Sequence, residues 1–447
     1  MRSWLYTAYA GLFMTSLFIS SETIEAALGA VGLLVIVSSF KAATRMYQII
    51  SFVFLCAAIT LVLLNDVSLQ AWYEFFTPMA LLLTLLYLLP FIQHFMTAAR
   101  LDQALFRIVE GQTQFFRTFY IRMSFTTYVL SLFIFFTAIP LMHRFISQRL
   151  RLMTNELKDQ AASRSILRAF ASVNAWSPIE VYIVMSLQIT SVAYGDVVLW
   201  LLGFSLTMLL IDWAQAAFKW RKIEIPEAAT SSQRFQFTFD KRIIWIVLFF
   251  IMFLLSAAFV SQFAELSFFE GIILVIVPYV VLWALILRRF RRFIQFHFAS
   301  KPRQMPAFHN FMVLFISLGV FNEVVERSGI MTTLASKASF LGEQPLLLFL
   351  FIQTSTLLLS LIGIHPLVTL SVQGLLVAPF LDDVAPLSVA IVLVTSVVAN
   401  DAAGTFGVPV TMMSQLTRRS PYKITAWNLG YAYLFGLAGV ALGMFLL

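Results

Sequence analysis

Long apolar runs recur along the whole 447-residue chain, separated by short polar links. Most are about 17–25 residues long, the length that an α-helix needs to cross a hydrocarbon core of about 30 Å. The sequence therefore predicts an all-α polytopic membrane protein with about 10–12 transmembrane helices. Ten runs are uninterrupted span candidates: residues 4–20, 23–40, 46–64, 75–95, 121–142, 197–217, 243–261, 268–287, 308–325 and 424–447.

The composition excludes a soluble protein with a single core. Apolar residues make up 60% of the chain and charged residues 12%, whereas about a quarter of the residues in soluble domains are charged. The net charge of +8 does not indicate a nucleic-acid partner, because Lys and Arg form short clusters between apolar runs, where they anchor topology. Cys56 is the single cysteine, so we expect no disulfide framework, no metal site and no cofactor apart from a coupling ion.

The N-terminus superficially resembles a signal peptide, since Arg2 precedes an apolar run. No convincing small-residue cleavage site precedes Glu22, and a second apolar run follows at once. We therefore expect residues 4–20 to be a retained first span.

Basic links predict the orientation of the second half. Residues 219–242 and 288–303 are both rich in Lys and Arg and are separated by two spans, so the positive-inside rule places both in the cytoplasm. A third cluster, at residues 418–423, reaches the same face if residues 346–380 make no net crossing. Each arm of that run is short for a full span, which favours a re-entrant hairpin. We expect a multi-pass protein of a bacterial plasma membrane.

The first half has a parity problem. Residues 100–122 and 144–168 are both basic, although one apparent span, residues 121–142, lies between them. Two alternatives remain open at this stage. Either residues 97–120 contain an interfacial or partial crossing, or one of the two basic stretches faces outward.

Three further apolar runs are interrupted. Residues 169–189 break at Ser177 and Pro178, residues 346–380 break at residues 363–366, and residues 387–416 break at residues 400–404. Backbone polar groups cannot be left unpaired in hydrocarbon, so a broken membrane helix indicates a protein-lined or water-filled cavity. Broken segments at matching positions of two halves indicate a transporter binding site.

Two of these breaks align without gaps. The segment SVNAWSPIEVYIVMSLQ, from Ser172, matches SLIGIHPLVTLSVQGLL, from Ser360, and Pro178 meets Pro366. We infer a structural duplication, in which the two breaks occupy matching positions of two repeats. The first covers residues 1–217 with a hairpin at about 163–190 and the second covers residues 243–447 with a hairpin at about 345–380. Residues 218–242 would form a cytoplasmic linker.

The second half resembles a known group. The run FISLGVFNEVVERSGIMTTLASKASFLG from Phe315, the break at residues 363–366 and the segment VTSVVANDAAGTFGVPVTMMSQLTRRSPYKITAWN are similar to the C-terminal half of the ion transporter superfamily. That superfamily includes divalent-anion:sodium symporters and arsenite permease-like proteins. The resemblance implies inverted repeats, an elevator-type motion, hairpin tips at residues 172–178 and 363–366, and an unwound helix at residues 400–409. The Ser-Asn-Thr tip signature of the symporters is absent, so a dicarboxylate substrate and a two-sodium stoichiometry do not follow.

Asp401 is the first candidate for coupling-ion or proton handling. A carboxylate in an apolar neighbourhood costs about 2.5 kcal/mol or more unless it is hydrated, paired, protonated or bound to a cation. The alternative is a helix end that reaches interfacial water. Gly404 and Gly407 indicate a second backbone opening with carbonyls for a cation, or only close helix packing.

His365 at the second break could bind substrate or titrate during transport, or it could be a structural group. Asn174 and Ser177 suit a neutral or anionic solute beside unwound backbone, or they cap the break. The full substrate-site prediction is Ser172, Asn174, Ser177, Gly363, His365, Thr369, Asn400 and Thr405, and the coupling-ion prediction is Asp401, Asn400, Gly404 and Gly407.

We expect a secondary active transporter, not an enzyme, that moves a small polar or anionic solute with a sodium or proton gradient. No phosphate-binding loop of the G-x-x-x-x-G-K-[ST] type is present, so ATP-driven transport would need another subunit. The alternatives are a flippase or exporter of a lipid or lipid-linked sugar and, with less support, a membrane-embedded transferase. The expected partners are the solute, membrane lipid and a second copy of the chain in a homodimer.

Overall fold

The computed structural model describes residues 2–65, 67–99, 115–225, 242–330 and 340–447. Within them, ten helical runs are long and apolar enough to cross a membrane, and the β-structure is limited to an isolated bridge between Phe115 and Glu224. The prediction of a polytopic all-α membrane protein is therefore confirmed. The run predicted at residues 4–20 forms α1 (Arg2–Ser16), which is not among the ten because fifteen residues rise only about 22 Å.

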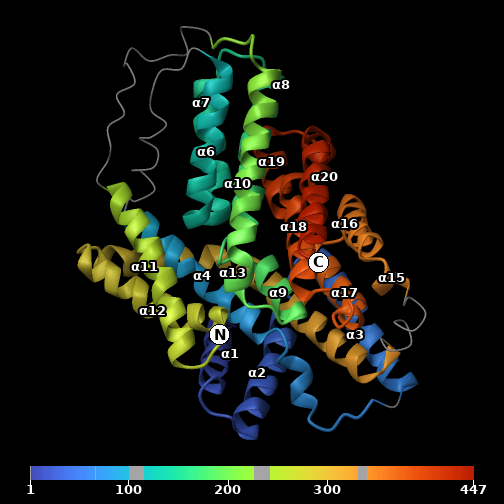
Figure 1. Cartoon of the computed structure of the whole chain (residues 1–447). Helices are drawn as coiled ribbons and strands as arrows, with labels where there is room; N and C mark the ends of the chain where they lie inside the picture. The colour runs from blue at the N-terminus through green and yellow to red at the C-terminus, as the bar shows by residue number, and fades with distance from the viewer. Residues whose placement is uncertain (1, 66, 100–114, 226–241, 331–339) are drawn as a thin grey trace. The chain divides into compact units, whose positions relative to one another are not determined.

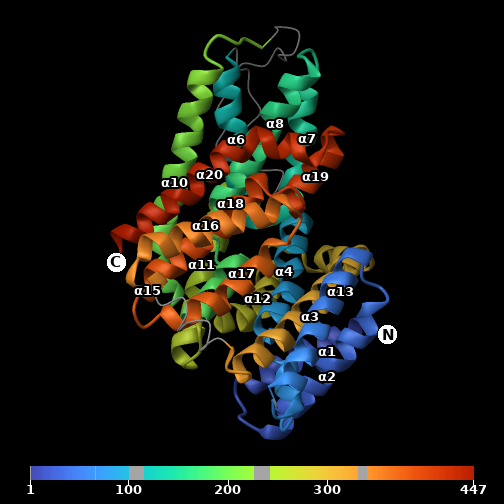
Figure 2. The ribbon, with the colours of Figure 1, turned by 90° about the vertical axis from the view of Figure 1, so that its right-hand side faces the viewer.

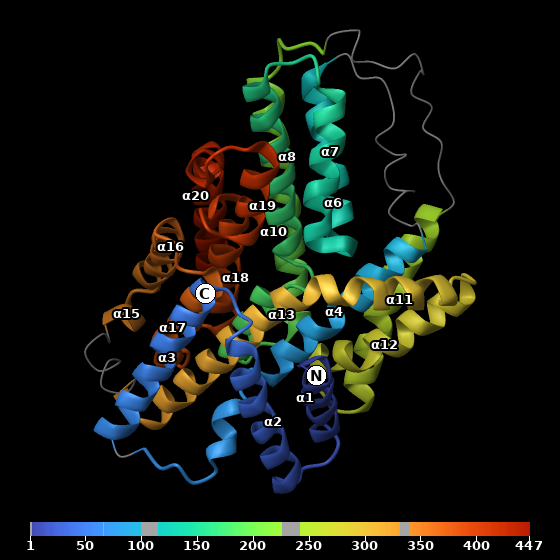
Figure 3. The ribbon, with the colours of Figure 1, turned by 180° about the vertical axis from the view of Figure 1, so that it is seen from behind.

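Packing divides the chain into two compact units, each built from separate stretches of sequence. Unit 1 takes Met1–Ala99, Leu248–Ser339 and Leu375–Pro379. In this unit α3 (Arg45–Leu64) and α13 (Phe290–Arg327) lie side by side (Figures 1 and 3). Its helices are α1, α2 (Glu22–Phe40), α3 (Arg45–Leu64), η1 (Trp72–Phe76), α4 (Ala80–Ala98), most of α11 (Arg242–Phe263), α12 (Phe268–Ile286) and α13 (Phe290–Arg327).

Unit 2 takes Arg100–Val247, Phe340–Gly374 and Phe380–Leu447. Its helices in the first half of the sequence are α6 (Phe116–Ile134), η2 (Phe135–Thr137), α7 (Ala138–Arg149), α8 (Asn155–Asn174), α9 (Val181–Thr190) and α10 (Tyr194–Lys219). Those in the second half are α15 (Phe340–Glu343), α16 (Pro345–Leu361), most of α17 (Pro366–Val377), α18 (Pro386–Ala403), α19 (Val408–Thr417) and α20 (Pro421–Phe445), with η4 (Ala378–Phe380) at the boundary between the units.

Helix α18 is the central helix of unit 2. Every residue from Ser388 to Ala403 is buried, as expected for a helix that is apolar on all sides. Helices α16 and α20 pack along it, as Figure 2 shows. Gly439 permits the close approach of α20, because a Cβ built there would lie 2.5 Å from Cβ of Thr395. Small residues at a membrane-helix interface allow such close packing.

The predicted span at residues 121–142 lies within the apolar helical run Phe116–Arg149, but the structure interrupts it. Helix α6 ends at Ile134 and α7 begins at Ala138, with Phe135 at a φ of 48° between them. A positive φ is rare for a bulky residue, so the backbone turns sharply at this point. Neither Gly nor Pro stands in the turn at residues 135–137, and the sequence pattern therefore gave no break signal.

The turn resolves the parity problem of the first half. The backbone N–H of Phe116, at the start of α6, donates to the carbonyl of Ile223, just beyond α10 (3.1 Å). Helix α7 leads through a short link to the start of α8, where Gln160 accepts from Lys219 at the end of α10 (3.5 Å). Helix α7 thus returns to the end of unit 2 at which α6 begins. The basic residues near Arg117 and those at 144–151 therefore share one end of this unit.

The predicted linker at residues 218–242 lies largely outside the described residues, because the structure describes nothing between residues 225 and 242. The division into repeats at residues 1–217 and 243–447 stays a prediction. Both halves of the sequence contribute helices to both units.

Candidate functional site

Three helix breaks lie within unit 2, and their predicted positions are largely confirmed. The first, residues 175–180, separates α8 from α9; the second, residues 362–365, separates α16 from α17. At the second break Gly363 has a φ of +102°, which favours glycine, and Pro366 begins α17, where its missing N–H costs no helical hydrogen bond. The third break begins at Gly404 rather than at Asn400, so the predicted start was four residues too early.

The first two breaks converge on consecutive residues of α18. Nδ2 of Asn174, the last residue of α8, donates to Oδ2 of Asp401 at 2.7 Å. Oγ of Ser360, near the end of α16, donates to Oδ1 of Asn400 at 2.6 Å. All four side chains are buried. The C-terminal ends of α8, α16 and α18 therefore meet around Asn400 and Asp401.

The loops of the second and third breaks are also in contact. A Cβ built on Gly363 would lie 3.2 Å from Cδ2 of Phe406. Thr405 lies in the third break, and its Oγ1 is 3.2 Å from Oγ1 of Thr425 in α20. Gly404 fits tightly against α18, because a Cβ there would lie 2.8 Å from the carbonyl oxygen of Asn400. Gly407 donates its N–H to the carbonyl of Gly404 at 2.9 Å.

Glu180 is a site residue that the sequence analysis missed. It precedes α9, is 2% exposed, and its Oε1 accepts from the backbone N–H of Tyr182 at 3.4 Å. Its Oε2 and Oδ1 of Asn174 have no hydrogen-bond partner among the described residues. Glu180 interacts electrostatically with Asp401. Its sequence signal was an acidic residue two positions after Pro178 in an otherwise apolar run.

Two buried carboxyl groups close together constrain the chemistry of the site. Both can be ionised at once only at a large cost, unless a cation lies with them or one of them holds a proton. The C-terminal ends of helices carry a partial negative charge, which adds to the attraction for a cation. Among the described residues, no group of three or more His, Cys, Asp or Glu side chains could hold a metal ion.

His365 caps α17. Its Nδ1 accepts from the backbone N–H of Leu367 at 3.3 Å, and its side chain is buried. Thr369 follows one turn later, is 1% exposed, and its Oγ1 has no hydrogen-bond partner among the described residues. This geometry supports the structural alternative for His365 and leaves a contact with solute as a prediction.

Ser172 and Ser177 have different surroundings. Oγ of Ser172 donates to the carbonyl of Arg168 at 2.9 Å and lies 3.0 Å from the hydroxyl of Tyr431, so Ser172 belongs to the packing between α8 and α20. Ser177 lies in the first break itself and is 2% exposed. Its backbone N–H donates to the carbonyl of Val173 at 3.1 Å. Of the two serines, only Ser177 lies within the break.

A buried ion pair supports the first hairpin, and the sequence analysis did not identify it. Nη1 of Arg168 lies 2.9 Å from Oδ1 of Asp212, and the two side chains are 6% and 1% exposed. Nε of Arg168 donates to Oδ1 of Asn428 at 3.1 Å, and the Tyr120 hydroxyl donates to Oδ2 of Asp212 at 2.8 Å. These contacts join α6, α8, α10 and α20 and thus fix α8 about 1.7 turns before Asn174.

Comparisons with known proteins agree with this architecture. No protein-family model matches the chain, and no curated protein matches it in sequence. Among solved structures, the chain is similar to the YdaH transporter of Alcanivorax borkumensis, with a TM-score of 0.59 and 15% sequence identity. The match covers 89% of this chain and 98% of that one. At this identity the likeness shows a shared fold alone.

Proposed function

We propose that this protein is a secondary active transporter that moves a small polar or anionic solute, driven by a sodium or proton gradient. The observation that carries the proposal is the convergence of three helix ends on Asn400 and Asp401, with Glu180 buried beside them. The fold shared with the YdaH transporter supports the class of function. A bacterial plasma membrane and membership of the ion transporter superfamily belong to the same proposal.

The coupling cation is assigned to Glu180 and Asp401. Their buried charges favour a sodium ion or a proton for the reasons given above, and the amide oxygen of Asn174 offers a further ligand beside Asp401. Oxygen ligands of this kind suit a hard cation. Binding of the cation would neutralise the pair and so permit the loaded site to move through the membrane.

The solute is assigned to the N-terminal ends of the helices that begin at the three breaks. Helices α9, α17 and α19 begin at the first, second and third breaks, and the positive N-terminal ends of half-helices favour an anionic group. Ser177, His365 and Thr369 supply polar side chains there. A solute that carries a negative charge or a polarised oxygen fits this arrangement.

The distribution of the predicted site residues between the two units supports an elevator-type motion. All predicted substrate and ion residues lie in unit 2, and none lies in unit 1. A rigid movement of unit 2 would therefore carry the complete site across the membrane. In this proposal the α8–α9 and α16–α17 pairs act as re-entrant hairpins of inverted repeats, and unit 1 serves as the static scaffold that a homodimer would use.

Uptake into proteoliposomes tests the proposal. The purified full chain is reconstituted, sodium and proton gradients are imposed separately, and a panel of labelled small anions and neutral polar solutes is offered. We expect one gradient to drive accumulation of at least one solute. Accumulation that is independent of both gradients for every solute would contradict coupled transport, and movement of fluorescent lipid alone would favour a flippase.

A variant pair tests the assignment of solute to the second break. His365→Asn keeps a side-chain acceptor for the N–H of Leu367 and so preserves the helix cap, whereas it removes the imidazole. We expect a higher KM for the solute and an unchanged unfolding temperature. An unchanged KM in this variant and in Thr369→Val would remove both residues from the solute site.

A further inference from the structure

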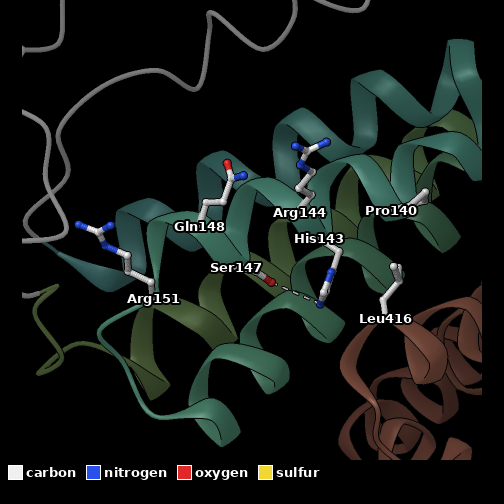
Figure 4. Close-up of a pocket in the computed structure, with 7 residues that line it drawn as sticks. All are labelled: Pro140, His143, Arg144, Ser147, Gln148, Arg151 and Leu416. Carbon is white, nitrogen blue, oxygen red and sulfur yellow. Dashed lines mark hydrogen bonds between the residues drawn. The ribbon is translucent and has the colours of Figure 1, made fainter.

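An open basic cleft lies at one end of unit 2, separate from the three helix breaks. Its volume is about 900 Å³, within the range of about 300–1,000 Å³ typical of ligand sites. Figure 4 shows α7 along one side of the cleft and Leu416 of α19 on the other. The lining residues are Pro140, His143, Arg144, Ser147, Gln148, Arg151 and Leu416.

The charge of the cleft is positive. Arg144 and Arg151 are exposed, no carboxylate lines the cleft, and neither arginine forms an ion pair with another described residue. The two acidic residues of α8 have other partners. Asp159 accepts from Nε of Arg419 at 2.9 Å, and Glu156 lies 3.1 Å from Nζ of Lys423.

The polar groups of the cleft are mainly donors. In Figure 4 Arg144 and Gln148 project in the same direction from α7, four residues apart on one helix face, as helical periodicity requires. Ser147 lies 3.4 Å from Nε2 of His143. Guanidinium, amide and hydroxyl donors together suit the oxygens of a phosphate group, which Arg binds through two parallel hydrogen bonds.

The position of the cleft suits an amphiphilic ligand. Pro140 and Leu416 give it apolar walls, whereas Arg144 and Arg151 lie near the end of unit 2 that also holds Lys219, Arg419 and Lys423. The positive-inside rule predicts that this end faces the cytoplasm. Basic pockets between membrane helices on that side suit anionic lipid head groups.

We propose that the cleft between α7 and α19 binds a phosphate-bearing anion, with Arg144 and Arg151 as its charged ligands. The phosphate belongs either to the head group of an anionic phospholipid or to a free phosphate compound. Gln148, which projects in the same direction as Arg144, donates to a remaining phosphate oxygen, and Leu416 contacts the apolar part of a lipid. This site is independent of the proposed solute site.

Titration of the purified full chain with defined lipids, followed by native mass spectrometry, tests the cleft. The probes are phosphatidylglycerol, phosphatidylcholine and inorganic phosphate. We expect phosphatidylglycerol to bind at least tenfold more tightly than phosphatidylcholine. The double variant Arg144→Gln/Arg151→Gln should weaken phosphatidylglycerol binding about thirtyfold, equivalent to about 2 kcal/mol, because each basic residue near an anionic surface contributes about half of that.

A charge-matched control uses Arg221→Gln/Lys222→Gln, which removes two positive charges just beyond α10 at the same end of unit 2. Binding in this control should stay within threefold of the wild type. Competition by millimolar phosphate would assign a soluble phosphate compound, and its absence would assign the lipid head group. Equal loss in both double variants, unchanged binding in the cleft variant, or no binding of phosphatidylglycerol and phosphate to the wild type would each overturn the proposal.

Discussion

Replacing Arg168 with methionine is predicted to destabilise unit 2 strongly. The guanidinium donates to Asp212 at 2.9 Å, to Asn428 at 3.1 Å and to the carbonyl of Trp427 at 3.2 Å. Its methionine replacement fills part of the space but leaves the carboxylate of Asp212, 1% exposed, without its counter-charge. Removing one partner of a buried ion pair costs about 3–5 kcal/mol.

The remaining contacts of Asp212 place the loss of stability in Arg168→Met near the lower end of the range of about 3–5 kcal/mol. The Tyr120 hydroxyl donates to both carboxylate oxygens, at 3.0 and 2.8 Å, and this donation remains in Arg168→Met. A hydrogen bond to a charged group contributes about 1.5–3 kcal/mol, so the carboxylate is not wholly unsatisfied. We therefore expect a loss of about 3 kcal/mol. The double variant Arg168→Met/Asp212→Leu should recover at least half of it, because no buried charge remains.

Unfolding of the detergent-purified protein, followed by its tryptophan fluorescence, measures these differences. Arg221→Met serves as the matched control, because Arg221 is exposed and its guanidinium carbon lies over the ring of Phe218, 5.4 Å from the ring centroid. We expect the control to change stability by less than about 0.5 kcal/mol. If Arg168→Met is as stable as the control, or the double variant is less stable than the single one, the buried ion pair does not hold α8 as described.

Two further predictions concern the helices around α18. Gly439→Ala should lower the unfolding temperature, because its Cβ would lie 2.5 Å from Cβ of Thr395 and overpacking costs about 1–3 kcal/mol; Gly430→Ala, where nothing lies within 4 Å, should raise it slightly. Ser360→Ala should cost about 1–3 kcal/mol in stability, because Oδ1 of Asn400 loses its 2.6 Å donor and stays buried. If Gly439→Ala and Gly430→Ala are equally stable, or if Ser360→Ala is as stable as the wild type, these contacts do not contribute to stability as described.

Local chemistry made much of the fold predictable. The apolar runs identified nearly all the long helices, since span length and composition depend on the sequence alone. The breaks at Pro178 and at residues 363–366 were also predictable, because Pro lacks a backbone donor and Gly favours unusual φ values. The turn at Phe135 was not, because an aromatic residue adopts a positive φ only when tertiary packing imposes it.

The candidate site was predictable only in part. Asn174 and Asp401 were identified from their polar character in apolar runs, but their 2.7 Å contact joins residues 227 positions apart and depends on the packing of α8 against α18. Glu180 was missed because its burial and its proximity to Asp401 are tertiary properties. Arg168 was missed because residues 144–168 were taken for a polar link, whereas most of α8 is buried.

The central claim is that Glu180 and Asp401 bind the coupling ion. It is tested most directly by a comparison of gradient-driven accumulation with solute exchange in Glu180→Gln and Asp401→Asn. Both changes remove a buried charge and keep the side-chain shape, and Asp196→Asn, an exposed carboxylate in α10, is the control. We predict that each site variant loses gradient-driven accumulation while exchange of internal for external solute persists, and that the control behaves as wild type. Wild-type accumulation in both site variants would show that the coupling ion does not bind where the helix ends converge.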